Sequence, residues 1–354
     1  MPLSRREFVR SLSVVGGAAL IKACSRAESN ELESNENFQP AYLNLEREGK
    51  FKSRVEEAYG RLESCDLCPH MCKVNRRAGK TGFCNAGERV KVYSHHAHFG
   101  EELPLVGRSG SGTIFFSNCN LRCVFCQNYP IAHEGRGREI SDEALGDLML
   151  NLQRRGCHNI NVVTPTHMMP NILGALRIAG NKGLRIPLCY NTGGYELPEV
   201  IKILDGIADI YLPDLKFMDG KESSLFALRE VPDYPKNAQE SIIEMHRQVG
   251  DLLTDDRGIA LKGLMIRHLV MPNRVAGTRE FVKWVAENLT LDTYVNIMSQ
   301  YRVEFRAFEF ERIARGITSG EFVEAMEWAL EAGLRNLDER SLTQLAIHRR
   351  SVGR

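Results

Sequence analysis

Short apolar, β-branched runs alternate with stretches of helical periodicity along most of this chain, and this alternation restricts the fold more than any other feature. Helical stretches lie near residues 145, 171, 199, 239 and 279, and a further one lies near residue 321. Six runs have the composition of buried strands: residues 113–117, 159–164, 186–191, 209–212, 263–270 and 293–298. Apolar strands separated by helices are typical of a parallel sheet covered by helices. Because a closed barrel needs eight such units, we expect an α/β fold in the form of a partial (β/α)6 TIM-like barrel.

Distinctive polar motifs follow directly after these expected strands. They are residues 119–126, 164–167 and 191–194, Asp214 with Lys216, Arg267 with His268, and Asn296. In barrels of parallel strands the carboxyl ends of the strands meet at one face, where the chemistry takes place. Any one of these residues could instead be an ordinary turn residue, since Asn, Gly and Pro are common after strands. Their coincidence predicts one functional site at the barrel mouth.

Three cysteines, Cys119, Cys123 and Cys126, stand in a C-x3-C-x2-C spacing immediately after the first expected strand. Three thiolates can hold an iron–sulfur cluster and leave one iron without a protein ligand, whereas a closed structural metal site normally has four protein ligands. The spacing therefore predicts a cluster with an open, reactive position. The alternatives are a zinc site or three unrelated core cysteines, because free cysteines are often buried.

A second group of four cysteines lies upstream, in a C-x2-C-x3-C-x11-C spacing. Its members are Cys65, Cys68, Cys72 and Cys84. Four soft ligands with this spacing predict one bound metal, and both zinc and a second [4Fe–4S] cluster accept four thiolates. The neighbouring Arg76, Arg77 and Lys80 could soften the negative charge of such a thiolate site or form a solvated face, and we favour the solvated face. Cys157 and Cys189 stand alone, and we expect both in the core.

Composition excludes some classes of partner. The chain has 354 residues and a formal net charge of +1, which gives no sign of a nucleic-acid surface. A chain of this length can form one large domain with a small appendage. Its ten cysteines are grouped like metal ligands rather than spread like a disulfide framework.

The triad, with Phe125 just before its last cysteine, resembles the signature of the radical S-adenosylmethionine (radical SAM) enzymes. In that family the open iron binds the methionine end of SAM, and an electron from the [4Fe–4S] cluster cleaves SAM to a 5′-deoxyadenosyl radical. Residues 65–87, 109–129, 159–167, 190–195, 210–216, 266–270 and 294–298 extend the resemblance to a group related to pyruvate formate-lyase-activating enzymes. The resemblance implies a radical SAM partial barrel over most of the chain.

The resemblance and the charges of SAM suggest roles for two residues at the end of the fourth strand. Lys216 would meet the SAM carboxylate, and Asp214 would meet its ammonium or ribose, because an Asp-Leu-Lys run stands at the corresponding strand end in the activating enzymes. The backbone of Phe125 would lie near the adenine. The family's Gly-Gly-Glu motif after the second strand is absent, and the hydroxyls of Thr164 and Thr166 are candidates for its place.

Three further residues are expected to bind SAM or substrate. Asn191 ends the third strand, while Arg267 and His268 lie near the end of the fifth. His268 has a structural alternative, in which a backbone carbonyl satisfies its ring.

The N-terminus, with Arg5 and Arg6 before a weakly apolar segment, resembles a twin-arginine export signal over residues 1–24. Cys24 ends a degenerate lipoprotein box and would carry a lipid anchor. The alternative is a basic tail on a cytoplasmic protein, which agrees with the cytoplasmic supply of SAM and reductant. The remaining segments are a polar linker over 25–50, a cysteine-rich extension over 51–100, the radical SAM barrel over 101–315 and a C-terminal helical segment over 316–354.

Three function classes follow from these motifs. The leading hypothesis is a radical SAM oxidoreductase that cleaves SAM and abstracts hydrogen, with an electron donor as partner and, by resemblance, a glycyl radical enzyme as protein substrate. A non-catalytic iron–sulfur protein for electron transfer or redox sensing is favoured by the missing Gly-Gly-Glu and the export signal. The presence of the triad, Asp214 and Lys216 argues against this non-catalytic hypothesis. A zinc-stabilised binding module requires the triad to be inert.

Overall fold

The computed structural model describes residues 38–352. The expected export signal, the lipid anchor at Cys24 and most of the expected linker lie outside these residues. Within residues 38–352, no helix combines the length and apolar character needed to cross a membrane.

Six parallel strands form the centre of a nine-stranded sheet. In spatial order they are β2 (Ser111–Phe116), β4 (Ile160–Val163), β5 (Leu188–Thr192), β6 (Ile210–Pro213), β8 (Ala260–Leu269) and β9 (Tyr294–Met298). Each coincides with one of the six apolar runs. The predicted fold class, an α/β partial barrel, is therefore confirmed.

Three antiparallel strands extend this sheet beyond the six predicted runs. β1 (Val90–His98) pairs with β2 and with β3 (Arg138–Ile140), and β7 (Leu253–Thr254) pairs with β8. β1 includes His95, His96 and His98, and most of its residues are only partly buried. A half-exposed edge strand lacks the continuous apolar run that marks the central strands.

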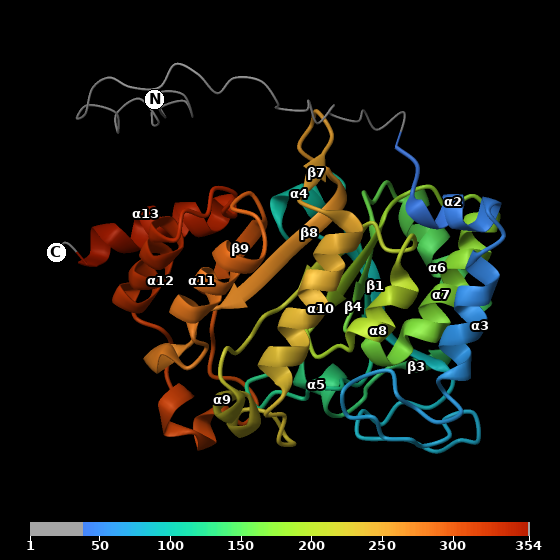
Figure 1. The fold of residues 1–354 in the computed structure, drawn as a ribbon, viewed down its shortest axis with the longest axis horizontal. Coiled ribbons are helices and arrows are strands. Elements are labelled where there is room, and N and C mark those ends of the chain that lie inside the picture. The colour runs from blue at the N-terminus through green and yellow to red at the C-terminus, as the bar shows by residue number, and fades with distance from the viewer. Residues whose placement is uncertain (1–37, 353–354) are drawn as a thin grey trace. The chain divides into compact units, whose positions relative to one another are not determined.

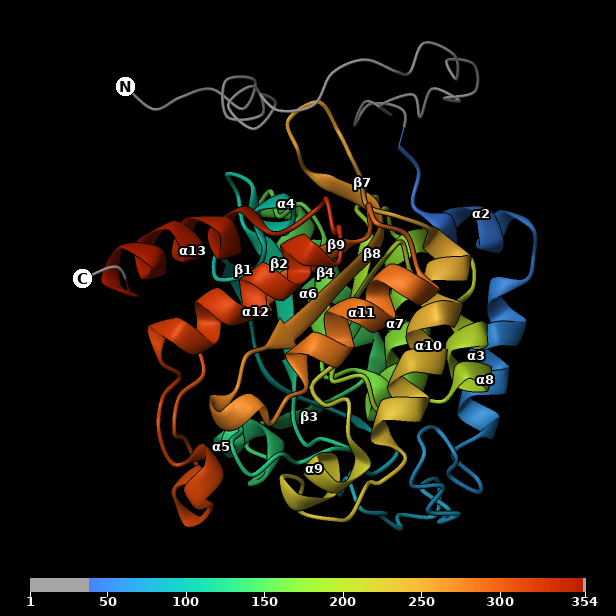
Figure 2. The same ribbon diagram turned by 60° about the vertical axis from the view of Figure 1, so that its left-hand side comes forward.

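Helices cover the outside of the sheet, as Figures 1 and 2 show. The main ones are α6 (Asp142–Arg154), α7 (Met169–Asn181), α8 (Pro198–Ile201), α10 (Tyr234–Val249), α11 (Thr278–Asn288), α12 (Ser319–Glu331) and α13 (Glu339–Val352). Local sequence sets their ends. Ser141 caps α6 by accepting the N–H of Ala144, and Gly156 follows that helix at a φ of 85°. Thr318 and Glu321 form a capping box at the start of α12.

Short elements connect the main ones. They are α4 (Leu103–Val106), α5 (Tyr129–Ala132), α9 (Gly220–Leu225) and the 3₁₀ turns Thr166–Met168, Lys202–Leu204, Pro272–Arg274, Ala307–Glu309 and Glu311–Ile313. α5 and α9 lie at the end of the sheet to which the parallel strands point (Figures 1 and 2). The irregular cysteine-rich segment after α3 (Phe51–Gly60) lies at the same end.

The end of the expected linker is a helix rather than a polar spacer. α2 (Ala41–Arg47) buries Tyr42 and Leu45, and it is followed by α3 (Phe51–Gly60). The Tyr42 hydroxyl donates to the carbonyl of Ile186 at 3.0 Å, and the N–H of Ala41 donates to Asp209 at 2.8 Å. Two apolar side chains one turn apart are enough to dock so short a helix, and they are easily overlooked among polar neighbours.

Candidate active site at the strand ends

A cavity of about 270 Å³ opens at the carboxyl ends of the parallel strands. All six strands and the loops that follow them contribute to its wall. The lining includes Phe116, Cys119, Cys123, Phe125, Cys126, Thr164, Asn191, Gly193, Asp214, Lys216, Arg267, Leu269 and Met298. The structure therefore brings together the triad and most of the residues that the strand-end pattern predicted.

The loop that carries the triad is kinked and anchored at several points. Asn118 and Arg122 both have left-handed φ values, 75° and 53°, which turn the chain sharply on either side of Cys119. Val124 donates its N–H to the carbonyl of Phe226 at 2.9 Å, and Cys123 forms a β-bridge with Ala227. These contacts fix the loop so that all three thiols lie on the wall of one cavity.

The surroundings of the triad fit an anionic cluster. The N–H groups of Leu121 and Arg122 point at Cys119 Sγ from 3.3 and 3.5 Å, and such donors stabilise thiolate charge. Burial raises the pKa of Cys126 to about 12 and raises that of Cys123 as well. Lys216 acts in the opposite direction on both thiols. Because burial alone favours the thiols, a bound metal would supply the compensating charge that converts them to thiolates.

Asp214 and Lys216 form an ion pair on the cavity wall. Burial disfavours the charged ammonium of Lys216, but the Asp214 carboxylate outweighs this effect and raises its pKa. The hydroxyl of Tyr234 accepts the N–H of Lys216 at 2.9 Å and lies 3.0 Å from the carbonyls of Gly193 and Asp214. This one hydroxyl therefore ties the loops after β5 and β6 together.

Gly194 lets these two loops approach each other. Its φ is 84°, and a Cβ at this position would lie 2.2 Å from the carbonyl oxygen of Asp214. Only glycine satisfies both conditions without moving the backbone that carries the ion pair.

Phe125, Thr164 and Asn191 also line the cavity. Phe125 packs against Phe217 and Tyr301, with ring centroids 5.9 and 6.1 Å apart. Thr164 has a φ of 57°, and its N–H donates to the carbonyl of Asn191 at 2.9 Å.

Two expected site residues do not line this cavity. His268 is fully buried: its Nδ1–H donates to the carbonyl of Leu215 at 2.7 Å, and its Nε2 accepts from the Thr278 hydroxyl at 3.0 Å. Its ring also stacks on Phe281 at 4.2 Å. His268 is therefore a structural histidine, which was the alternative interpretation. Successive side chains of a strand point to opposite faces of the sheet, so His268 and Arg267 lie on different faces.

Thr166 is the second exception. Its hydroxyl donates to the carboxylate of Glu196 at 2.6 Å, and the Thr192 hydroxyl donates to the same oxygen. Glu196 is fully buried, and burial raises its pKa to about 7. Glu196 follows Gly193 and Gly194 after β5, so the chain does have a glutamate close to a Gly-Gly pair. Tyr195 separates Glu196 from the Gly-Gly pair, however, and the carboxyl group of Glu196 forms hydrogen bonds in the protein interior. The sequence interpretation missed it.

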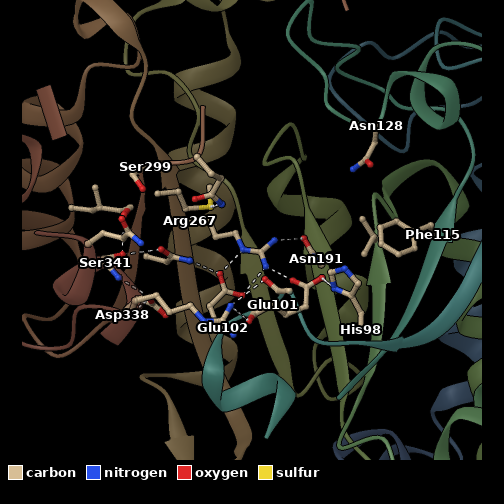
Figure 3. Close-up of a pocket in the computed structure, with 18 residues that line it drawn as sticks. His98, Glu101, Glu102, Phe115, Asn128, Asn191, Arg267, Ser299, Asp338 and Ser341 are labelled. Carbon is tan, nitrogen blue, oxygen red and sulfur yellow. Dashed lines mark hydrogen bonds and ion pairs between the residues drawn. The ribbon is translucent and has the colours of Figure 1, made fainter. Parts of the chain in front are cut away.

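A larger chamber of about 460 Å³ adjoins the cavity and shares Phe115, Asn128, Val163, Asn191, Arg267, Met298 and Gln300 with it. Figure 3 shows Arg267 between Asn191 and two carboxylates, Glu101 and Glu102. Arg267 Nε and Nη2 donate to Glu102 at 2.6 Å, and Nη2 also contacts Glu101. Asn296, a residue from the strand-end pattern, donates to Glu102 at 2.7 Å.

Sequence reasoning missed both glutamates, since adjacent acidic residues before a short helix look like a solvated turn. Burial opposes ionisation of Glu101, yet Arg267 and His98 lower its pKa to about 2. The hydrogen bond with Glu101 in turn raises the pKa of His98. The two glutamates and Arg267 therefore form a charged wall with one more carboxylate than guanidinium.

The four upstream cysteines line one small pocket together with His70, Arg76, Gly82 and His167. A Cβ at Gly82 would lie 2.7 Å from Cys72 Sγ, so this glycine makes room for the sulfur. Within residues 38–352, no three His, Cys, Asp or Glu side chains are arranged to hold a single metal ion. Arg76 is only 1% exposed, which corrects its interpretation as part of a solvated face, whereas Arg77 is exposed.

Cys157 and Cys189 are both buried, 3% and 0% exposed, as expected. Neither lines the cavity or the chamber described above. They are core residues.

Comparisons with known proteins identify the family of this chain. The sequence profile of the radical SAM superfamily matches residues 113–285. An uncharacterized protein of Methanocaldococcus jannaschii is 32% identical over 304 residues, which cover 83% of this chain and 82% of the relative.

Two solved structures are similar at 14% identity. Methylornithine synthase has a TM-score of 0.39 over 64% of this chain and 70% of its own. A cobalamin-dependent S-adenosylmethionine radical enzyme has a TM-score of 0.34 over 59% of this chain and 31% of its own. With the superfamily profile spanning five of the six parallel strands and the cysteine loop, the chain belongs to the radical SAM superfamily.

Proposed function

We propose that this protein is a SAM-cleaving enzyme that abstracts hydrogen from a substrate held in the chamber beside the triad. The observation that carries this proposal is that Cys119, Cys123 and Cys126 share one cavity with the Asp214–Lys216 ion pair. Superfamily membership implies a [4Fe–4S] cluster and SAM. When bound, they supply the electron transfer that cleaves SAM to methionine and a 5′-deoxyadenosyl radical.

In this proposal the residues of the chain bind the cluster and SAM, orient SAM and shield it from water. The three thiolates hold the cluster, and Lys216 and Asp214 bind the carboxylate and the ammonium of SAM as opposite charges. Phe125 and its aromatic neighbours exclude water from one side of the cavity. Asn191 and Arg267 line both the cavity and the chamber, so they stand where SAM and substrate would meet.

The resemblance to activating enzymes suggests a glycyl residue of a partner protein as substrate. The chamber supports a polar occupant, because Glu101, Glu102, Arg267, Asn128 and Asn191 are among its lining residues. A peptide backbone offers the N–H and carbonyl groups that such a wall recognises. We therefore propose an extended peptide segment as the occupant of the chamber and an electron-donor protein as a second partner.

The four upstream cysteines are proposed to hold a second metal centre, either an iron–sulfur cluster or zinc. We further propose that the twin-arginine segment exports the folded protein, with Cys24 as a lipid anchor. Replacing Arg5 and Arg6 by lysine should then leave the protein in the cytoplasm. An unchanged distribution between cytoplasm and envelope would remove the export hypothesis.

The test of the catalytic proposal is anaerobic reconstitution with iron and sulfide, reduction with dithionite and an assay for 5′-deoxyadenosine. The wild type should form this product, and Cys123→Ala should not. Cys157→Ala is the matched control, since it removes a buried thiol that does not line the cavity and should retain activity. A reconstituted wild type that binds SAM and forms no deoxyadenosine would overturn the proposal in favour of a non-catalytic iron–sulfur protein.

A further inference from the structure

Arg76 is a buried cation without a carboxylate partner. Its side chain is 1% exposed, and Nε and Nη2 both donate to the carbonyl of Gly87, at 3.1 and 2.6 Å. Nη1 has no hydrogen-bond partner. No carboxylate among residues 38–352 forms an ion pair with it. A buried, unpaired guanidinium is costly, so this position calls for an anion.

The anion is available in the same pocket, because Arg76 lines it together with Cys65, Cys68, Cys72 and Cys84. Four thiolates around a metal carry excess negative charge, whether the metal is zinc or a cluster. A buried cation with a free N–H donor is the residue type that such a centre needs beside it.

The redox chemistry of the two kinds of centre distinguishes them at this place in the fold. Zinc neither takes up nor releases electrons, whereas an iron–sulfur cluster does both. A cluster is therefore the centre that gains a function from lying next to the triad.

The four-cysteine segment also touches the triad loop directly. His70, between Cys68 and Cys72 in sequence, donates from Nε2 to the carbonyl of Asn120 at 2.7 Å, and Asn120 is the residue after Cys119.

Two further contacts lie alongside this hydrogen bond. Arg122 Nη1 lies 3.4 Å from the carbonyl of Phe83, and Asn118 Nδ2 lies 3.4 Å from the carbonyl of Asn85. Both acceptors are the immediate neighbours of Cys84.

A fourth contact comes from the strand-end loop after β4. His167 lines the four-cysteine pocket and donates from Nε2 to the carbonyl of Ser117, two residues before Cys119. The walls of the two cysteine groups are thus joined by hydrogen bonds at residues 117–122.

We propose that Cys65, Cys68, Cys72 and Cys84 hold a redox-active iron–sulfur cluster that passes single electrons to the triad. Arg76 compensates the negative charge of this cluster, and His70 couples its loop to the triad loop. This inference rests on the proposed SAM-cleaving function, which consumes one electron per cleavage. The electron comes from a low-potential one-electron donor protein, is taken up by the four-cysteine cluster, and leaves it again for the triad cluster. Cys72 is partly exposed beside the exposed Met71, so this centre approaches the surface.

The first experiment isolates the four-cysteine centre in the full chain with Cys119, Cys123 and Cys126 all replaced by alanine. After reconstitution this chain should retain about four iron atoms and a reducible EPR signal. Adding Arg76→Gln should shift the midpoint potential to more negative values, because loss of the positive charge disfavours the added electron. Arg76→Lys keeps the charge and should restore most of the potential. Arg77→Gln is the matched control, since Arg77 is exposed and paired with Glu63 and Glu88.

Zinc without reducible iron in this chain would overturn the proposal, and so would equal potentials in Arg76→Gln and Arg77→Gln. If circular dichroism shows that Arg76→Gln does not fold, the midpoint potentials of Arg76→Lys and Arg77→Gln are compared instead. Lysine cannot reproduce the planar guanidinium donors, so the potential of Arg76→Lys should be slightly more negative than that of Arg77→Gln.

The second experiment tests electron delivery with the triad intact, using reduced flavodoxin as the donor protein and dithionite as the small reductant. In Cys68→Ala, flavodoxin should no longer reduce the triad cluster, whereas dithionite should still reduce it. If flavodoxin reduces the triad cluster equally in Cys68→Ala and in the wild type, the proposed electron transfer through the four-cysteine cluster is overturned. Failure of the proposed function looks different: both clusters would be reducible in the wild type, and no deoxyadenosine would form.

Discussion

The ammonium of Lys216 and the carboxylate of Asp214 form an ion pair on the wall of the cavity that the three cysteines share. They leave the same strand end two residues apart, and the hydroxyl of Tyr234 fixes the backbone between them. A zwitterionic amino acid group can replace this internal pair with two ion pairs of its own. This arrangement supports the proposal that the pair binds the methionine end of SAM.

Replacing Lys216 by methionine should weaken SAM binding by about tenfold or more, since a charged hydrogen bond contributes about 1.5–3 kcal/mol. Equilibrium dialysis of SAM against the reconstituted protein measures this change. Lys221→Met, which removes an exposed lysine from α9, is the control and should bind SAM like the wild type. Equal SAM affinity in Lys216→Met and Lys221→Met would contradict the assigned role.

His268→Leu should destabilise the fold without changing SAM affinity in the folded protein. The substitution leaves the carbonyl of Leu215 without its donor, and an unsatisfied buried polar group costs about 1–3 kcal/mol. Urea denaturation gives the loss of stability, and dialysis gives the affinity. A large loss of SAM affinity with normal stability would instead place His268 at the binding site.

Gly194→Ala should disturb the site far more than a glycine substitution elsewhere. Its Cβ would meet the carbonyl of Asp214, so the loops after β5 and β6 must separate. Gly183→Ala is the matched control, because Gly183 also has a positive φ, 105°, but nothing lies within 4 Å of the added Cβ. The control should lose about 1–2 kcal/mol of stability from backbone strain alone and keep SAM binding. If both variants bind SAM normally, the close approach does not hold the ion pair in place.

Glu196 should make stability depend on pH. Its pKa is about 7 in the folded chain because of burial, against about 4.3 in an unfolded chain. The folded state therefore holds a proton that the unfolded state has released, and stability is lost as pH rises through this window. The loss reaches about 3 kcal/mol by pH 8.

Glu196→Gln removes this loss. The difference in unfolding free energy between the variant and the wild type should move in favour of the variant by about 3 kcal/mol between pH 4 and pH 8. Urea denaturation at several pH values measures it. A difference that stays constant with pH would show that Glu196 has an ordinary pKa.

The parts of the fold that the sequence predicted are those with strong local patterns. Buried parallel strands are continuously apolar, so all six could be found from composition alone. The triad could be found because its ligands lie within eight residues, from Cys119 to Cys126. In contrast, β1 is half-exposed and contains three histidines, so its pairing with β2 is visible only in three dimensions.

The features that were missed depend on contacts between distant segments. Glu102 reaches its partners Arg267 and Asn296 across more than 160 residues. Arg76 looks like a surface arginine beside Arg77, and only the packing of the cysteine-rich segment buries it. Charge composition cannot reveal such residues, because a buried charge differs from a solvated one only in its neighbours.

The most direct test of the central claim is the EPR spectrum of the reduced cluster held by Cys119, Cys123 and Cys126, recorded before and after SAM is added. It is best measured in Cys68→Ala, where the second cysteine group cannot contribute a complete centre. SAM is expected to change this spectrum, and Cys123→Ala is expected to abolish it. A reduced triad cluster whose spectrum is unchanged by saturating SAM would show that SAM does not bind at the triad.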